Sequence, residues 1–140
     1  MRVEAIHLGA DKAGKLSTVD SVHAVAGKGL EGDRHFKANG AKPGQALTLV
    51  EAEEVERVGL SAGETRRQLT VSGVRLNDLV GKNFKVGEIE CYGVELCEPC
   101  EHLESMTRPG IIKDLVHRAG LNADILTDGR IAVGDAVTEL

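Results

Sequence analysis

Closely spaced glycines divide this chain into short apolar runs, and that pattern limits the folds open to it. Glycine makes up 17 of the 140 residues, or about 12% against a usual share of about 7%. The apolar runs between glycines are shorter than most helices and carry the partial alternation of strands. Many short strands in a small chain favour a closed or nearly closed barrel, because closure removes exposed sheet edges. We therefore expect a mainly β fold, a β-barrel with a few short helices.

The same pattern places the expected elements along the chain. Strands are expected at 46–50, at 68–72, as two runs within 83–96, and as an opening hairpin of 3–8 with 19–25. A closing hairpin around an Asp-Gly turn is expected from 123–126 and 131–133. Short helices are expected at 51–58, where Gly59 ends the helix, at 77–80 and at 111–116. The polar segment 27–44 is too long for a simple turn and is a candidate functional loop.

Size and charge exclude several classes of protein. A chain of 140 residues fits one domain, 1–140, which can fold around a single core without disulfides. Its 17 basic and 22 acidic residues give a net charge of -5, and aromatics make up 2% with no Trp, which argues against a nucleic-acid partner. The sequence carries no secretion signal and no apolar run long enough for a bilayer. An odd count of 3 cysteines fits reduced thiols, so we expect a cytoplasmic protein without a membrane partner.

The segment 96–104 concentrates reactive side chains around one proline. Pro99 fixes its own φ and disfavours a helical residue before it, so the chain should turn here and Cys100 should open the next helix. Unpaired N–H groups at a helix start favour a thiolate, which is both a nucleophile and a soft-metal ligand. Cys100 is therefore the predicted catalytic residue and metal ligand, with Cys97 and His102 as neighbouring candidates.

Other interpretations of these cysteines stay open. Cys97 and Cys100 have the spacing of a zinc half-site, and Cys91 with His102 would complete four ligands, although a second paired half-site is absent. A thiol-disulfide oxidoreductase would need a βαβ setting, which the strand-rich pattern does not favour. A further alternative is that Cys97 and Cys100 only pack, beside carboxylates on a solvated helical turn. Cys91 is expected to be an inert core residue.

Two further groups of residues suggest an anion site. In the run 29–35, Gly32 allows close backbone approach, Arg34 can grip a phosphate or pterin oxygen with two N–H groups, Asp33 can orient Arg34, and His35 can add a donor. The alternative is a tight turn capped by Asp33. The pair Arg66-Arg67 comes directly before an expected strand, where it is either part of the anion site or a solvated pair of charges.

Taken together, these segments resemble the MOSC domain, a family named for the C-terminal part of molybdenum cofactor sulfurases. The resemblance rests on the order and spacing of motifs over most of the chain. They are Gly29-Leu30-Glu31-Gly32-Asp33-Arg34-His35, then Arg66-Arg67-Gln68-Leu69-Thr70, the runs 73–81 and 84–87, Cys97-Glu98-Pro99-Cys100-Glu101-His102-Leu103, the run 117–121 and Val133-Gly134-Asp135. The family's fold is a β-barrel with short helices, in agreement with the strand pattern.

The resemblance also implies a chemistry. Family members use one cysteine to accept sulfur from a pyridoxal-phosphate-dependent desulfurase, or to ligate the metal of the molybdenum cofactor (molybdopterin) in molybdenum enzymes. By position that residue is Cys100, and the loop with Arg34, together with Arg67, would bind the anionic end of the pterin. Gln68 stands where many relatives carry Asn. The implied activity is that of a sulfurtransferase or of a component of a molybdenum-dependent oxidoreductase, and the alternative is a non-catalytic module that delivers cofactor.

Overall fold

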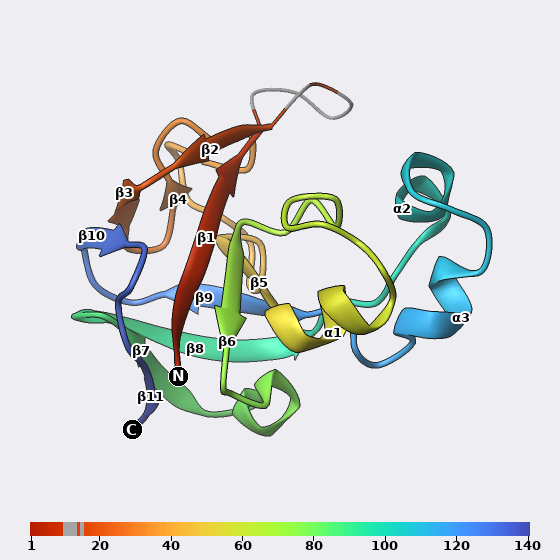
Figure 1. Ribbon diagram of the computed structural model, residues 1–140. Coiled ribbons are helices and arrows are strands. Elements are labelled where there is room, and N and C mark those ends of the chain that lie inside the picture. The colour runs from red at the N-terminus through yellow and green to blue at the C-terminus, as the bar shows by residue number, and fades with distance from the viewer. Residues whose placement is uncertain (10–13, 15) are drawn as a thin grey trace.

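The computed structural model describes residues 1–9, 14 and 16–140, and these form a strand-rich fold with short helices (Figure 1). The strands are β1 (Arg2–Leu8), β2 (Ser17–Val19), β3 (Ser21–Val25), β4 (Gly29–Leu30), β5 (Leu47–Glu51), β6 (Leu69–Ser72), β7 (Asn83–Val86), β8 (Ile89–Leu96), β9 (Leu121–Ile125), β10 (Gly129–Ala132) and β11 (Val137–Glu139). The helices are α1 (Ala52–Arg57), the 3-10 turn η1 (Leu76–Leu79), α2 (Glu101–Met106) and α3 (Ile111–Leu115). The helices expected at 51–58, 77–80 and 111–116 are confirmed to within a residue or two.

The larger sheet curls into a half-barrel. Its eight strands follow the order β11-β7-β8-β9-β5-β6-β1-β2. Neighbours are antiparallel except β5 and β6, which are parallel and joined through α1. The two sides of the curl meet where Val3 N donates to Asp135 O at 2.9 Å and Val137 N donates to Met1 O at 3.0 Å. The mainly β, barrel-type fold expected from the glycine spacing is therefore confirmed.

In each of the two expected hairpins, one strand pairs with a different strand from the one expected. β1 pairs with β2, but Asp20 separates β2 from β3, and β3 joins β10 and β4 in a second sheet. The turn expected within the opening hairpin lies largely outside the described residues. The closing hairpin is wrong, because β9 pairs with β8 and β5 whereas β10 pairs with β3. Asp128 explains the change: its Oδ1 accepts a bond of 2.6 Å from Ala26 N, directly after β3, and so draws the Asp-Gly turn to the small sheet.

Two apolar clusters hold the fold together. The main cluster fills the barrel and includes Phe84 and Cys91, both fully buried. Burial raises the pKa of the Cys91 thiol to about 12, so this residue is the inert core cysteine that the sequence predicts. The second cluster joins α2 and α3 to the chain after α1 through Val58, Leu103, Ile111, Leu115 and Ala119.

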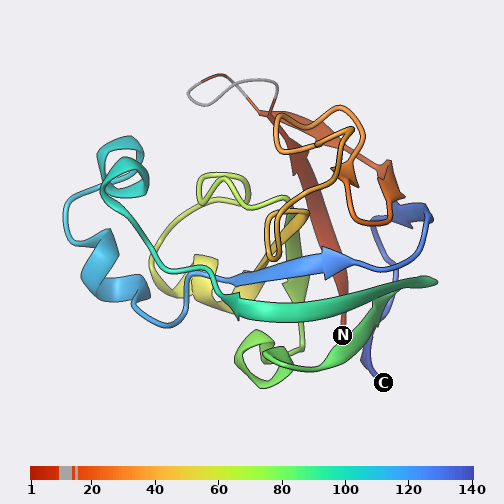
Figure 2. The ribbon, with the colours of Figure 1, turned by 180° about the vertical axis from the view of Figure 1, so that it is seen from behind.

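The small sheet and the pair α2 and α3 lie on opposite sides of the barrel, as both ribbon views show (Figures 1 and 2). The cysteine segment connects the end of β8 to α2 and therefore passes from the barrel to the helical side. Within the described ranges, every helix is too short or too polar to cross a membrane.

Candidate functional site

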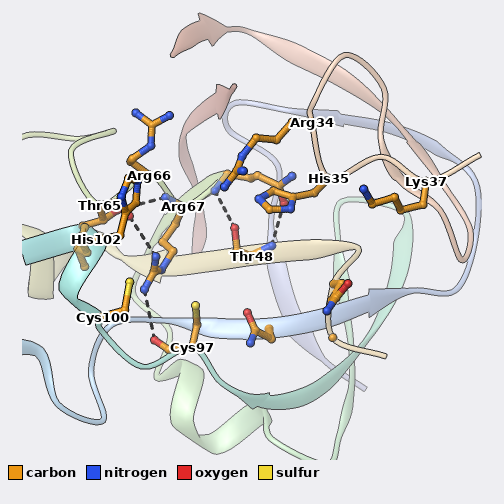
Figure 3. A pocket seen from close by; sticks show the side chains of 15 residues that line it. Arg34, His35, Lys37, Thr48, Thr65, Arg66, Arg67, Cys97, Cys100 and His102 are labelled. Atoms are coloured by element: carbon orange, nitrogen blue, oxygen red, sulfur yellow. Dashed lines mark hydrogen bonds between the residues drawn. The ribbon is translucent and has the colours of Figure 1, made fainter. Parts of the chain in front are cut away.

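A cavity of about 430 Å³ brings together three segments that are far apart in the sequence (Figure 3). They are the loop after β4, the residues before β6, and the cysteine segment with the start of α2. Of the residues predicted for the site, those that line the cavity are Arg34, His35, Arg66, Arg67, Cys97, Cys100 and His102. Gly32 and Asp33 lie outside this lining. The volume is within the range of about 300–1,000 Å³ that is usual for small-molecule sites.

The lining of the cavity is cationic although the chain as a whole is acidic. Arg34, Lys37, Arg66 and Arg67 contribute side chains, and the described lining residues include neither Asp nor Glu. The net charge of the chain is -5. Positive charges gathered in a recess attract anionic ligands and oppose the entry of cations. The sequence shows each arginine, but only the fold brings the arginines into one recess.

Asp33 fixes the loop after β4, which forms one wall of the cavity (the loop wall). Its side chain is buried. Oδ1 accepts a hydrogen bond from Gly9 N at 2.9 Å, and Oδ2 accepts from His35 N at 3.0 Å and from Gln68 Nε2 at 2.8 Å. The carboxylate therefore fixes the backbone that carries Arg34 and His35, whereas its expected hydrogen bond to the Arg34 guanidinium is not among the contacts of the described residues. The interpretation of the loop as a turn capped by Asp33 is confirmed, and Arg34 and His35 of this turn line the cavity.

Gln68 joins the loop wall to the barrel. Besides donating to Asp33, its Oε1 accepts from Thr48 N at 2.9 Å, and its own N donates to Thr48 Oγ1 at 3.0 Å. Thr48 and Lys37 line the cavity but were not predicted. Thr48 interrupts the apolar run of β5 with a hydroxyl, which is the signal that could have indicated it. Lys37 lies in the polar segment 27–44, whose length already indicated a functional loop.

Arg67 links the strand side of the cavity to the cysteine segment. Its Nε donates to Ala119 O at 2.9 Å, Nη1 to Thr65 O at 3.2 Å and Nη2 to Cys97 O at 3.5 Å. A guanidinium has five N–H groups, so one N–H remains on each terminal nitrogen for a ligand. Arg66 has a positive φ of 60°, and its Nη2 donates to Gly14 O at 3.0 Å.

The two cysteines of the segment differ in exposure. Cys100 caps α2 in an extended conformation and is exposed, and its carbonyl accepts from Glu104 N at 3.0 Å. The prediction that Cys100 opens a helix is therefore confirmed. Cys97 is partly buried, and its N donates to Gly120 O at 2.8 Å. Burial raises the pKa of the Cys97 thiol, while the nearby Arg67 charge partly offsets that rise.

The carboxylates of Glu98 and Glu104 form their hydrogen bonds outside the cavity. Glu98 Oε1 accepts from His117 N at 2.6 Å, and Oε2 lies 2.6 Å from His117 Nδ1. Glu104 Oε1 accepts from the N atoms of Gly110 and Ile112 at the start of α3, each at 3.1 Å. These contacts hold the cysteine segment and α2 against α3 and leave both carboxylates out of the cavity lining.

The sequence that forms this barrel and cavity matches a known protein family. A family model described as MOSC domain matches residues 4–138. The chain belongs to the MOSC domain family. The match includes the whole cavity and confirms the resemblance drawn from the motifs.

Solved structures share the fold of this MOSC domain. The YuaD protein from Bacillus subtilis superposes with a TM-score of 0.81 at 17% identity, over 97% of this chain and 93% of that one. YiiM from Geobacillus stearothermophilus gives a TM-score of 0.74 at 20% identity, over 99% and 74% of the two chains. YiiM from Escherichia coli gives 0.72 at 16% identity, over 100% and 70%. A comparison with curated proteins gave no match.

The geometry of the MOSC domain does not support the four-ligand zinc alternative. Cys91 is buried inside the barrel, whereas Cys97 and Cys100 line the cavity. Over the described ranges, no group of three or more His, Cys, Asp or Glu side chains is placed to hold a metal ion. His102 Nε2 is buried and lacks a hydrogen-bond partner among the described residues. The polar groups that line the cavity include thiols, imidazoles, guanidinium groups and the ammonium group of Lys37.

His35 gives the anion site an expected pH dependence. Burial lowers the pKa of His35, and the adjacent Arg34 charge lowers it further, so the ring gains its proton only below about pH 6.5. Sulfate is a suitable probe, because it keeps both negative charges between pH 5 and pH 8. We expect its affinity, measured by calorimetry, to increase by about tenfold as His35 becomes charged below that pH. In the His35→Gln variant the increase should shrink, and an increase as steep as in the wild type would show that His35 is not its source.

Proposed function

We propose that this MOSC domain binds the molybdenum cofactor in the cationic cavity and uses Cys100 as a metal ligand or as the carrier of a transferable sulfur atom. The observation that carries the proposal is the composition of one recess. Arginines and a lysine line it together with two thiols, one of them exposed. Guanidinium groups suit the anionic end of a pterin cofactor, and a thiolate suits a polarizable metal or a sulfane sulfur atom.

The residues present fit the cofactor in charge, donor type and volume. Arg34, His35 and Lys37 lie along the loop wall, where they would hold an anionic group, and Cys100 lies at the other side of the cavity with His102 (Figure 3). When bound, the cofactor would supply a redox-active metal. The chain's own contribution is to hold the anionic end through charge, to present a thiolate, and to keep the walls fixed through Asp33, Gln68 and Arg67.

Sulfur transfer to Cys100 would need an open approach for a partner protein. The partner proposed is a pyridoxal-phosphate-dependent desulfurase that carries a persulfide. The Cys100 thiolate would attack the terminal sulfur of that persulfide, a new S–S bond would form on Cys100, and the desulfurase cysteine would leave as a thiolate. Cys100 is exposed at the start of α2, which supports this role. Cys97 and Cys91 are less accessible.

The test is to measure the metal and the pterin that the protein retains. We expect protein purified from cells that make the cofactor to contain molybdenum and pterin. Cys100→Ser should lose molybdenum by about tenfold or more, because a hydroxyl is a poor ligand for a soft metal. Cys97→Ser is the matched control in the same cavity and should retain the metal.

A separate variant tests the anion side of the cavity. Arg34→Ala should lower the retained pterin, because it removes one charged donor. Wild-type protein that holds no molybdenum, no pterin and no persulfide on Cys100 after treatment with a desulfurase would refute the proposed function. Full function of Cys100→Ser in cells that lack the native protein would instead favour the non-catalytic delivery module.

A further inference from the structure

Two thiols line the cavity, and a metal ligand or sulfur carrier requires only one. Cys97 and Cys100 come from the same short segment, and both side chains point into the cavity (Figure 3). A negative charge on Cys100 is one of the influences that raise the pKa of Cys97, which is expected when two sulfur atoms lie near each other. A role for the pair must therefore explain why the second thiol is there.

The backbone of Cys97 is held on both sides. Its N donates to Gly120 O at 2.8 Å, and its O accepts from Arg67 Nη2 at 3.5 Å. The residue that follows, Glu98, is bound to His117 through both carboxylate oxygens. These contacts hold the backbone of the segment while the Cys97 side chain lines the cavity.

The two thiols also differ in their accessibility to a protein partner. Cys100 is exposed, whereas Cys97 is partly buried, so a protein partner can deliver sulfur to Cys100 more readily than to Cys97. Cys97 remains accessible from within the cavity. A persulfide on Cys100 would share the cavity with the Cys97 thiol, so Cys97 can attack it without a second molecule.

We propose that Cys97 is a resolving thiol that discharges a persulfide on Cys100 and releases hydrosulfide into the cavity. The proposal rests on the proposed role of Cys100 as a sulfur carrier. It assigns a function to Cys97 in that role and identifies the released species as an inorganic sulfide anion.

The step balances without a further oxidant. The Cys97 thiol releases its proton to solvent, its sulfur attacks Cys100 Sγ, a Cys97–Cys100 disulfide forms, and the bond between Cys100 Sγ and the terminal sulfur breaks. The electron pair of that bond leaves with the terminal sulfur, which keeps the persulfide proton and departs as hydrosulfide. The Cys97 sulfur is oxidised to the disulfide level, and the terminal sulfur is reduced to sulfide. A dithiol reductant then restores both thiols.

The lining suits the released anion. Arg66 and Arg67 border the same recess as the two thiols, and their charges favour hydrosulfide over neutral species at that place. An intramolecular attack also has a large advantage over attack by a thiol in solution, because the reacting groups share one short segment.

The experiment loads reduced protein with inorganic polysulfide, removes the excess, and follows intact mass and released sulfide. Wild-type protein should gain one sulfur atom and then convert to a disulfide with loss of two hydrogens, releasing one sulfide. Cys97→Ser should gain the same sulfur on Cys100 but release sulfide about a hundredfold more slowly. Cys97→Ala is a second variant that shows whether a hydroxyl matters, and circular dichroism checks that both variants fold.

The outcomes separate this inference from the proposed function. A wild-type persulfide as long-lived as that of Cys97→Ser would overturn the resolving role while leaving Cys100 as a carrier. Failure of Cys100 to take up sulfur would count against the carrier role itself. Oxidation with diamide tests the pair without any persulfide: peptide mapping should find Cys97 joined to Cys100, and the absence of that disulfide would overturn the inference whatever the loading result.

Discussion

Gly120→Ala is expected to destabilise the protein by more than about 4 kcal/mol. Gly120 precedes β9 with φ +128°, and a Cβ added there would lie 2.1 Å from Leu49 O in the neighbouring strand β5. Leu49 O is a backbone atom and the position of the Cβ is fixed by the backbone of residue 120, so the overlap can be relieved only by separating β5 from β9, which pair at Leu49 and Leu121. Because natural domains are stable by about 5–15 kcal/mol, the variant should lose much of its margin. Urea unfolding and the soluble yield measure the effect.

The same substitution should also disturb the candidate site. Gly120 O accepts the hydrogen bond from Cys97 N, and the preceding Ala119 O accepts from Arg67 Nε. Displacing this stretch therefore moves the cysteine segment and one arginine together. Protein that does fold should show faster alkylation of Cys97 than the wild type, because its partial burial would be lost.

Gly59→Ala is the matched control for Gly120→Ala. Gly59 also has a positive φ, +77°, but an added Cβ would meet no atom within 4 Å. The control carries the backbone strain without the overlap and should cost about 1 kcal/mol. Equal losses in the two variants would mean that the contact with Leu49 O is relieved easily, and the argument from close packing would fail.

Local chemistry explains what the sequence predicted well. Pro99 and the residues around it were sufficient to place Cys100 at a helix start, since the constraint of a proline acts on its immediate neighbours. The apolar spacing likewise indicated α1, η1 and α3, and the low share of helix indicated a barrel. The core position of Cys91 follows from its chemistry, because a free cysteine is among the residue types most often buried.

Long-range contacts explain what the sequence did not predict. The bond from Ala26 N to Asp128 Oδ1 joins residues 102 positions apart and decides that β10 leaves β9 for β3. The same is true of Asp33, whose partners Gly9 and Gln68 lie 24 and 35 positions away. An Asp next to a glycine indicates a turn in both places, but the pattern does not say which distant N–H group the carboxylate will bind.

The cavity has some features that the sequence predicts and others that only the fold reveals. Its arginines and cysteines were each singled out by type and setting, and the fold brings them together. The role of an arginine in the cavity depends on which of its N–H groups remain free for a ligand. Three N–H groups of Arg67 donate to carbonyl oxygens, and the spacing of residues in the sequence does not show this. The family resemblance supplied the expectation that these segments meet, and the fold supplies the reason, through Asp33, Gln68 and Arg67.

Asp33→Asn is expected to destabilise the protein by about 2–4 kcal/mol. The buried carboxylate accepts three N–H groups, one on Oδ1 and two on Oδ2. The Asn side chain keeps one oxygen and carries an NH₂ group in place of the other. This NH₂ group must face either Gly9 N–H or the donors from His35 and Gln68. At least one buried donor is then left without an acceptor, whichever way the amide is turned. Thermal and urea unfolding measure the loss.

Sulfate binding by Asp33→Asn separates a positioning role from simple charge. Removing a negative charge near a cationic cavity should strengthen sulfate binding if Coulomb attraction alone acts. If Asp33 instead fixes the backbone that presents Arg34 and His35, the affinity should fall by about tenfold, equivalent to the loss of one charge-assisted hydrogen bond. Titration at pH 8 keeps His35 neutral, since its pKa is lowered in the folded protein. The two explanations thus predict opposite signs under one condition.

Glu31→Gln provides the control for charge. Glu31 is exposed, lies two positions before Asp33 and loses the same single charge. We expect it to bind sulfate slightly more tightly than the wild type and to keep its stability, because an exposed charge acts only through a screened field. Tighter sulfate binding by Asp33→Asn as well would show that the carboxylate acts by charge alone, and the loop wall would then not depend on its three hydrogen bonds.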